Sequence, residues 1–213
     1  MTFKSIKHNP FKVVEMFEEE VAEYTGAPYA VAVDSCTNAL FLCLKWMEKQ
    51  GKTYPTINIP KKTYVSVAQT ILNAGFDLEF RKEKWEGMYK LSPYSIYDCA
   101  KRFTSDMYCP GTFICLSFHI KKHLPIGKGG VILTDQGCAA SWFKKARYEG
   151  RSEKNYRNDN INQEGWNYYM TPEEAARGLT LMQNYPKHMP DQIEDPPYVD
   201  LTTFDRFKHC KVI

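Results

Sequence analysis

The sequence predicts a layered α/β domain with a mostly parallel sheet. Short apolar runs typical of buried strands alternate along the chain with segments of helical periodicity, which is the pattern of βαβ units. Polar motifs directly follow several of these strands, at the edge where such sheets bind ligands. With 213 residues, 43% of them hydrophobic, the chain is long enough to bury one core as a single globular unit.

The first half of the chain predicts a helix followed by two strand-and-helix units. Residues 10–25 carry apolar side chains at helical spacing and stop at Gly26, a suitable C-cap. A strand over 29–35 then runs through a tight turn at 34–37 into a helix over 36–50. The elements expected next are a strand over 56–60, a helix over 63–74 and a strand over 77–82.

The second half predicts three more strands and two more helices. The strands are expected over 94–98, 112–118 and 129–134, and the helices over 136–149 and 172–184. Residues 185–197 hold four prolines and several charges, which predicts an extended connector. The segment after this connector is too short for a second domain.

Composition excludes several classes of function. A net charge of +3 does not imply a nucleic-acid partner, and the N-terminus lacks a signal peptide's apolar core, as the chain lacks a membrane-spanning run. The seven cysteines include no CxxC pair, so their spacing supports neither a disulfide framework nor a zinc site. We therefore expect a protein of the reducing cytoplasm, with no membrane and no nucleic-acid partner.

A basic cluster near the fourth predicted helix has two interpretations. Lys144, Lys145, Arg147 and Arg151 could contact phosphates, and nucleic-acid binding through them is the weakest functional hypothesis. A solvated helix face is the favoured interpretation.

The turn after the first strand places hydroxyls at a helix N-terminus. Ser35 and Thr37 lie where free backbone N–H groups and the helix dipole favour an anion such as phosphate. Simple N-capping by Ser35 explains the same residues and is favoured on this motif alone.

Asp98 ends another predicted strand and is followed by small or apolar residues, which suggests a carboxylate withdrawn from water. Such a group needs a cationic or hydrogen-bonding partner. The partner is either the protonated ring nitrogen of a cofactor or a structural ion pair with Lys101 or Arg102.

Residues 117–130, SFHIKKHLPIGKGG, crowd two adjacent lysines and two histidines between two strands. A lysine there becomes a nucleophile if desolvation and nearby cations lower its pKa; otherwise Lys121 and Lys122 simply face solvent. His119 and His123 are four residues apart, but no acidic residue stands between them and the lysines would repel a metal, so we predict no metal site.

Six stretches now carry a resemblance to a known family. They are FEEEVAEYTGAPYAVAVDSCTNAL, IPKKTYVSVAQTILNAG, YDCAKRF, SFHIKKHLPIGKGGVILT, ARYEGR and GWNYYMTPEEAARGLTLMQ. In this order they resemble the DegT/DnrJ/EryC1/StrS family of pyridoxal-phosphate-dependent nucleotide-sugar aminotransferases, in a shortened form. The resemblance implies a three-layer domain like the large domain of fold type I transferases, with the small C-terminal domain largely absent. Residues 1–185 would form the cofactor-binding domain and 186–213 an extended C-terminal tail.

The resemblance also implies roles for individual residues. It makes Lys122 the Schiff-base lysine, pairs Asp98 with the pyridine nitrogen, and places Tyr64 on the face of the cofactor ring. The expected phosphate ligands are Ser35, Thr37 and Ser117. Asn167 matches an asparagine that reaches the neighbouring subunit's cofactor, which implies a homodimer with shared active sites.

The chain departs from the family pattern at three site positions and in length. Cys36 replaces a glycine of the phosphate turn, Lys101 replaces a glutamine or histidine near the cofactor's phenolic oxygen, and Lys128 replaces a glutamate. The span between Gly75 and Asp98 has room for little more than a strand and a hairpin, where the family has a further strand and helix.

The implied reaction is transfer of an amino group from a donor such as glutamate to a keto-sugar nucleotide, with pyridoxamine phosphate formed between the two halves. Two alternatives remain open. One is a scaffold or interaction protein that binds the cofactor but has lost turnover. The other is the family's dehydratase branch, in which histidine replaces the lysine; Lys122 argues against it, whereas the adjacent His123 leaves the register to be tested.

Overall fold

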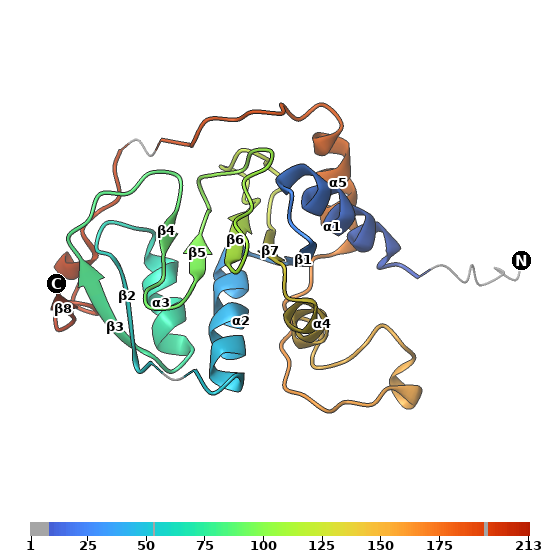
Figure 1. Cartoon of the computed structure of the whole chain (residues 1–213), viewed down its shortest axis with the longest axis horizontal. Helices are drawn as coiled ribbons and strands as arrows, with labels where there is room; N and C mark the ends of the chain where they lie inside the picture. The colour runs from blue at the N-terminus through green and yellow to red at the C-terminus, as the bar shows by residue number, and fades with distance from the viewer. Residues whose placement is uncertain (1–8, 53, 194–195) are drawn as a thin grey trace, which may run out of the picture.

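A five-stranded mixed sheet forms the centre of the computed structural model, which describes residues 9–52, 54–193 and 196–213 (Figure 1). Its strands lie in the order β1 (Tyr29–Val33), β7 (Gly130–Thr134), β6 (Phe113–Ser117), β5 (Ile96–Asp98) and β4 (Tyr89–Lys90). A second sheet has the order β2 (Thr56–Pro60), β3 (Asp77–Arg81) and β8 (Lys211–Val212). An isolated bridge between Asn58 and Ser92 joins β2 to the end of β4, so the two sheets lie side by side.

The prediction of a mostly parallel sheet was wrong. Strand β7 runs antiparallel to both of its neighbours, β1 and β6, and β4 runs antiparallel to β5. Among the strands of the described residues, the parallel pairs are β5–β6, β2–β3 and β3–β8. The reason lies in the connection from β6 to β7: residues 118–129 contain no helix, and a parallel crossover normally needs one.

The predicted helices are confirmed, with their ends moved by a few residues. They are α1 (Lys12–Thr25), α2 (Cys36–Lys49), α3 (Val65–Asn73), α4 (Gly137–Ala146) and α5 (Pro172–Met182), with short 3₁₀ turns at Tyr156–Asn158 and Leu201–Thr203. Gly26 closes α1 in the left-handed conformation, at a φ of 74°. Within the described ranges, no helix is both long and apolar enough to cross a bilayer.

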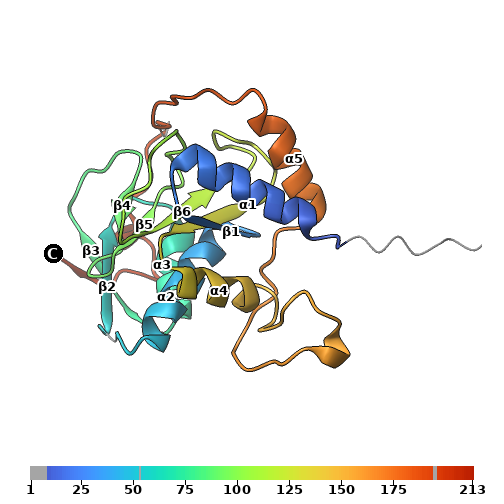
Figure 2. The ribbon, with the colours of Figure 1, turned by 45° about the vertical axis from the view of Figure 1, so that its right-hand side comes forward.

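Helices cover both faces of the central sheet, which gives the molecule three layers (Figure 2). Successive side chains of a strand point to opposite faces, and β7 shows the result. Val131 and Leu133 pack in the core beneath α1 and α5, whereas Ile132 packs in the core formed with α2, α3 and α4. The two apolar cores therefore fix the sheet between its helices.

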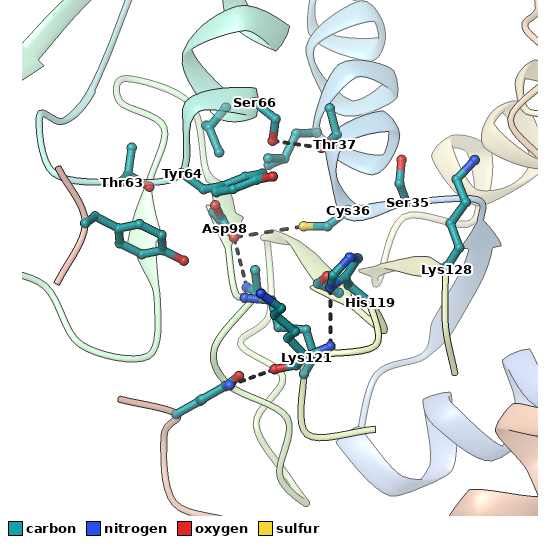
Figure 3. Close-up of a pocket in the computed structure, with 18 of the residues that line it drawn as sticks. Ser35, Cys36, Thr37, Thr63, Tyr64, Ser66, Asp98, His119, Lys121 and Lys128 are labelled. Carbon is teal, nitrogen blue, oxygen red and sulfur yellow. Dashed lines mark hydrogen bonds between the residues drawn. The ribbon is translucent and has the colours of Figure 1, made fainter. Parts of the chain in front are cut away.

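The C-terminal ends of three strands lie together at one end of the sheet (Figure 3). Strands β1, β6 and β5 run in the same direction, because β7 lies antiparallel between β1 and β6 and because β5 is parallel to β6. Ser35 follows β1, Asp98 ends β5 and Ser117 ends β6. The fold thus brings together the polar motifs that the sequence separates.

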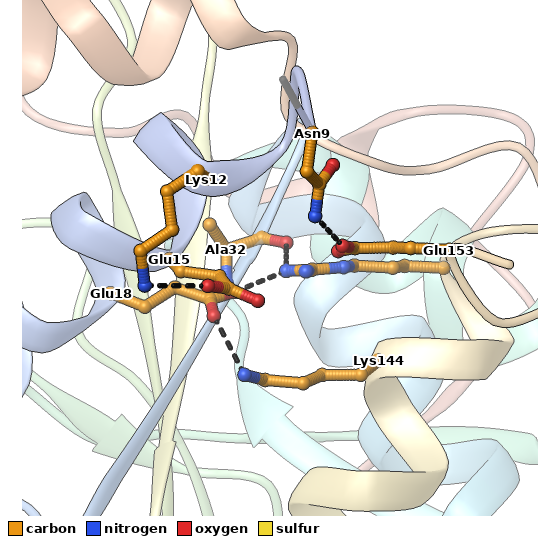
Figure 4. A network of polar contacts seen from close by, with 8 residues as sticks. Asn9, Lys12, Glu15, Glu18, Ala32, Lys144 and Glu153 are labelled. Atoms are coloured by element: carbon orange, nitrogen blue, oxygen red, sulfur yellow. Dashed lines mark hydrogen bonds and ion pairs between the residues drawn. The ribbon is translucent and has the colours of Figure 1, made fainter. Parts of the chain in front are cut away.

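Strand β1 is the outermost strand of the five-stranded sheet. A buried ion pair covers the side of β1 that faces away from β7 (Figure 4). Glu18 of α1 accepts the Ala32 N–H at 2.9 Å, and Arg147 donates both to Glu18 and to the Ala32 carbonyl. Lys144 contacts the same carboxylate at 3.0 Å from a half-exposed position. Strand edges need such protection against pairing with other chains.

This ion pair corrects the interpretation of the basic cluster as a solvated face. Arg147 is only 4% exposed and is part of the structural core, although Lys144 does reach solvent. Arg151 lies over the rings of Tyr148 and Tyr156, at 5.0 and 4.9 Å.

The segment after α5 returns across the molecule to β3. Leu201 and Phe207 are buried in the core beside α2 and α3, and β8 adds a strand to the second sheet. The division of the chain at residue 185 into a domain and a tail stays a prediction. Residues 194–195, within the predicted connector, lie outside the described part of the chain.

Replacing Arg147 by methionine should lower the free energy of unfolding by about 3–5 kcal/mol, because the buried Glu18 carboxylate loses its guanidinium partner. Urea unfolding followed by circular dichroism measures the loss. Lys144→Gln is the matched control: it removes a half-exposed cation from the same carboxylate and should cost about 1 kcal/mol or less. Similar small losses in both variants would contradict a structural role for the buried pair.

Candidate active site

A cavity of about 440 Å³ opens at the edge where the strand ends meet (Figure 3). Its volume is in the range of small-molecule sites. Most of the residues proposed from the sequence line it: Ser35, Cys36, Thr37, Tyr64, Asp98, Ser117 and Lys122. Lys101 and Asn167 are not among its lining residues.

The N-terminus of α2 forms one wall of this cavity. Ser35 is in an extended conformation and its hydroxyl accepts the Asn38 N–H at 3.2 Å, so the predicted N-cap is confirmed. The Thr37 hydroxyl lies 2.9 Å from that of Ser66, at the start of α3. The sequence interpretation missed Ser66, which faces Thr37 only because α2 and α3 pack together.

Lys128, one of the departures from the family pattern, lies beside this turn. Its ammonium donates to Asp34 Oδ2 at 3.0 Å, while its side chain stays 62% exposed. Asn38 donates to the other oxygen of Asp34 at 2.7 Å. The added positive charge is therefore directed at a neighbouring carboxylate of the same turn.

Asp98 is the buried acid of the cavity, with 5% of its surface exposed. Its oxygens accept the Tyr89 hydroxyl at 2.8 Å and the Ala100 N–H at 2.9 Å, and the Cys36 sulfur lies 3.9 Å from Oδ1. Burial raises the pKa of Asp98, and these hydrogen bonds together with the Lys122 ammonium act in the opposite direction. Burial likewise raises the pKa of the Cys36 thiol.

The structural alternative for Asp98, an ion pair with Arg102 or Lys101, does not occur. Arg102 instead binds Asp191 through two contacts, of 2.8 and 2.5 Å. The Lys101 ammonium lies over the Tyr198 ring, 4.9 Å from its centroid, and 5.8 Å from that of Trp85. Asp98 forms no ion pair with any residue in the described part of the chain, so its carboxylate is available to a ligand in the cavity.

The loop between β6 and β7 carries the candidate nucleophile. Lys122 is half-buried and Lys121 exposed, and both line the cavity, whereas His123 does not. The loop is held by backbone hydrogen bonds, including Lys122 N–H to the His119 carbonyl at 2.8 Å. Across the described residues, no group of three or more His, Cys, Asp or Glu side chains is arranged to hold a metal ion.

Tyr64 lies at the mouth of the cavity and is 58% exposed. It is the residue before α3, and its ring centroid is 6.4 Å from that of Tyr198. An exposed ring at this position offers a flat apolar face to a bound ligand.

Asn167 lies away from the cavity, on the protein surface. Its side chain donates to Glu149 at 3.2 Å, and its backbone forms a bridge with Tyr148. Its predicted role in a neighbouring subunit's site stays a prediction.

A segment far along the chain supplies another wall that sequence reasoning missed. Gln192, Ile193 and Tyr198 line the cavity together with Trp85. Gln192 donates to the Lys121 carbonyl at 2.7 Å. The two residues of this hydrogen bond are 71 positions apart in the chain, so no local sequence pattern indicates the contact.

The chemical groups that line the cavity match those that pyridoxal phosphate needs. Hydroxyls and free N–H groups at a helix N-terminus suit its phosphate, the buried carboxyl suits its ring nitrogen, and the amine of Lys122 suits its aldehyde. A cation opposite Asp98 would also offset the burial that raises the pKa of this acid.

Fold and site together define an α/β protein of the sugar-aminotransferase type. The profile of the DegT/DnrJ/EryC1/StrS aminotransferase family matches residues 4–81 and 104–194, and the chain belongs to this family. Its members are pyridoxal-phosphate-dependent sugar aminotransferases. The match leaves out residues 82–103, which include both Trp85 and Asp98.

Solved structures share the fold at low sequence identity. A DegT DnrJ EryC1 StrS aminotransferase from Brucella abortus is 16% identical with a TM-score of 0.73, over 94% of this chain and 80% of that one. The sugar aminotransferase CalS13 from Micromonospora echinospora is 17% identical with a TM-score of 0.70, over 82% of this chain and 61% of that one. PseC from Helicobacter pylori, an aminotransferase of pseudoaminic acid biosynthesis, is 16% identical with a TM-score of 0.67, over 87% and 64%.

One curated relative matches a shorter stretch more closely. The spore coat polysaccharide biosynthesis protein SpsC from Bacillus subtilis is 47% identical over 62 residues, which is 29% of this chain and 15% of that protein. The aligned region thus spans a small part of SpsC and about 60% of several of the structural neighbours.

Replacing Asp98 by asparagine should stabilise the cofactor-free protein at neutral pH and have little effect in acid. Because burial raises the pKa of Asp98, the folded state holds its proton more tightly than the unfolded chain does. This tighter proton binding stabilises the folded state fully at a pH below the ordinary carboxyl pKa. The stabilisation is lost as the pH rises through the raised pKa of Asp98, and it amounts to about 1.4 kcal/mol for each unit by which that pKa is raised. Asparagine cannot ionise and avoids that loss.

Urea unfolding of the cofactor-free protein across this pH range tests the prediction. Asp205→Asn is the matched control, because it makes the same change at a side chain that is 96% exposed. A difference between Asp98→Asn and wild type that stays constant with pH would contradict the assigned ionisation.

Proposed function

We propose that this chain is a pyridoxal-phosphate-dependent aminotransferase that moves an amino group from a donor such as glutamate to a keto-sugar nucleotide. The observation that carries the proposal is the single cavity in which Lys122, the buried Asp98 and the hydroxyls at the start of α2 meet. Family membership supports the reaction class.

In this proposal, Ser35, Thr37 and Ser117 hold the cofactor phosphate, with the dipole of α2 favouring its negative charge. Tyr64 covers one face of the ring from the cavity mouth. Asp98 faces the ring nitrogen and keeps it protonated, and Tyr89 and Ala100 hold the carboxylate in place through their hydrogen bonds. When bound, the cofactor supplies an electron sink for the substrate's α-carbon.

Lys122 has two roles. Its Nζ would hold the cofactor through the cofactor's aldehyde carbon and, when released, would take the proton from the α-carbon of the amino donor. The position of Lys122 in the cavity favours aminotransfer over the dehydratase alternative, because the adjacent His123 does not line the cavity. The half-buried setting of the lysine limits the water that competes for its proton.

Cofactor binding without turnover is the second candidate function. It is favoured by Cys36, whose thiol lies 3.9 Å from Asp98 Oδ1 and adds a side chain at the phosphate turn. The absence of Lys101 from the cavity lining also supports it, because the family resemblance implies a cofactor contact at this position.

Replacing Lys122 by alanine should abolish the visible absorption band that appears when the protein is reconstituted with pyridoxal phosphate. Lys121→Ala is the matched control, since Lys121 lines the same cavity but is more exposed, and it should keep the band. Added glutamate should shift the band in wild type and Lys121→Ala. Any residual conversion in Lys122→Ala should be slower by about 10²–10⁴-fold, the usual contribution of a positioned acid–base group.

The outcomes separate the candidate functions. A stable band that glutamate does not change, while other amino acids also fail, would support binding without turnover. A band that survives in Lys122→Ala and disappears in Lys121→Ala would overturn the assignment of the nucleophile.

The homodimer with shared active sites is part of the same proposal and rests on Asn167. If its amide reaches the partner's cofactor, Asn167→Ala should weaken cofactor retention about tenfold, as expected for a lost hydrogen bond of about 1.4 kcal/mol. Equilibrium dialysis measures retention and analytical ultracentrifugation the oligomeric state. Asn162→Ala, at another exposed asparagine, is the control. A monomeric wild type, or unchanged retention, would contradict the role of Asn167.

A further inference from the structure

Tyr89 is a buried residue whose hydroxyl lies between two other polar groups. Its oxygen is 2.8 Å from Asp98 Oδ2 and 2.7 Å from the hydroxyl of Thr63, and Thr63 is only 2% exposed. Thr63 and Asp98 both line the cavity, whereas Tyr89 lies behind them (Figure 3). The three side chains form one hydrogen-bonded row, here called the Thr63–Tyr89–Asp98 network.

The register of two short strands places Tyr89 beside the carboxyl group. Tyr89 of β4 is directly opposite Asp98 of β5 in an antiparallel pair, so the two side chains project from the same face. A slip of one residue would turn Tyr89 to the other face. Strand β4 lies in residues 82–103, which the family profile leaves out, so the profile assigns no role to Tyr89.

The hydrogens of this network are best satisfied when Asp98 is ionised. Thr63 then donates to Tyr89 and Tyr89 donates to Asp98, so both hydroxyl hydrogens have an acceptor. Asp98 Oδ1 already accepts the Ala100 N–H at 2.9 Å. A hydrogen bond to an ionised acceptor is also stronger than one to a neutral acceptor.

Protonation of Asp98 would reverse the direction of the network. Oδ2 would donate to the Tyr89 oxygen, and the Tyr89 hydrogen would turn to Thr63. The Thr63 hydrogen would then have no other acceptor within the residues that the structure describes. An unpaired buried donor is unfavourable, so the network opposes protonation of Asp98.

The other titratable groups around Asp98 come from α2, β6, the loop after β6 and the end of β5. They are the Cys36, Cys115 and Cys99 thiols and the Lys122 ammonium. Burial raises the pKa of the three thiols and of the Tyr89 phenol, so each keeps its proton from acid to slightly alkaline pH. The Cys36 sulfur also lies nearer to the Cys115 carbonyl, at 3.5 Å, than to Asp98.

We propose that Tyr89 and Thr63 are positioning residues that keep the buried Asp98 ionised and aimed into the cavity, ready for the protonated ring nitrogen of the cofactor. The identity of that ligand rests on the proposed function. The ionised state of Asp98 is a property of the cofactor-free protein and is tested without the ligand.

Urea unfolding of the cofactor-free protein, from acid to slightly alkaline pH, tests the proposal in a double-mutant cycle of Tyr89→Phe and Asp98→Asn. Tyr89→Phe raises the pKa of Asp98 further, so more stability is lost as the pH rises through it. The variant should therefore increase the unfolding equilibrium constant about tenfold more at the alkaline end than at the acidic end. With Asp98→Asn present, this pH dependence should disappear.

Tyr185→Phe is the matched control for the loss of a phenol. The Tyr185 hydroxyl donates to the Phe103 carbonyl at 3.2 Å, an acceptor that cannot ionise, so its removal should cost the same at both ends of the pH range.

Variants of Thr63 separate the network from simple packing. Thr63→Val keeps the shape of the side chain but removes the hydroxyl, and it should show the pH effect of Tyr89→Phe at smaller amplitude. Thr63→Ser keeps the hydroxyl and should keep the pH dependence of wild type. Thr63→Val also tests the proposal if Tyr89→Phe does not fold.

Pyridoxamine phosphate tests the link to the ligand, because it has no aldehyde and binds without a covalent bond to Lys122. Equilibrium dialysis of the cofactor-free protein should give a Kd about tenfold higher in Tyr89→Phe than in wild type, as expected for a weakened ion pair with Asp98. Tyr185→Phe should leave this Kd unchanged.

Three results would overturn the proposal: equal costs of Tyr89→Phe at the two ends of the pH range, a pH effect that persists with Asp98→Asn, or the same Kd for pyridoxamine phosphate in Tyr89→Phe and wild type. The unfolding cycle needs no cofactor. Its failure is therefore distinct from failure of the proposed function, which the absorption band at Lys122 reports.

Discussion

The close approach of β7 to the turn before α2 is the constraint on which the site depends. A side chain at Gly130 would place its Cβ 2.5 Å from the Cys36 nitrogen and from the Ser35 carbonyl carbon, so only glycine allows this contact. The contact holds the N-terminus of α2 against the end of the loop that carries Lys122. Parallel pairing of β5 with β6 then places Asp98 beside the strand that leads into the same loop. Three sequence-distant groups therefore share one cavity.

The electrostatics of the cavity follow from that geometry. Burial opposes ionisation of Asp98, whereas hydrogen bonds from Tyr89 and Ala100 and the nearby Lys122 ammonium support it. A buried acid with such neighbours is suited to a cationic ligand, because the ligand's charge offsets the desolvation. The Cys36 thiol occupies space beside this carboxylate, with its sulfur 3.9 Å from Asp98 Oδ1.

Local sequence patterns predicted the helices and several strands well. The features that they missed depend on contacts between residues far apart in the chain. Strand 56–60 coincides with β2, and Gly26 and Ser35 cap their helices as expected, because these signals depend on neighbouring residues. The prediction of parallel strands was wrong, because a buried strand has the same apolar pattern in a parallel and in an antiparallel sheet. The link between β6 and β7, which contains no helix, was a usable clue to antiparallel pairing. Burial of Arg147 and the wall formed by Gln192 and Tyr198 depend on distant partners, for which one sequence gives no signal.

Reduction of the pyridoxal-phosphate-loaded protein with borohydride, followed by peptide mass mapping, tests the central claim most directly. The reduction fixes the cofactor to whichever amine holds it. The account predicts a single modified residue, Lys122, in near-stoichiometric yield. Label on Lys121, label spread over surface lysines, or none at all would contradict it, because the geometry that gathers Asp98, the start of α2 and Lys122 would then not form a working site.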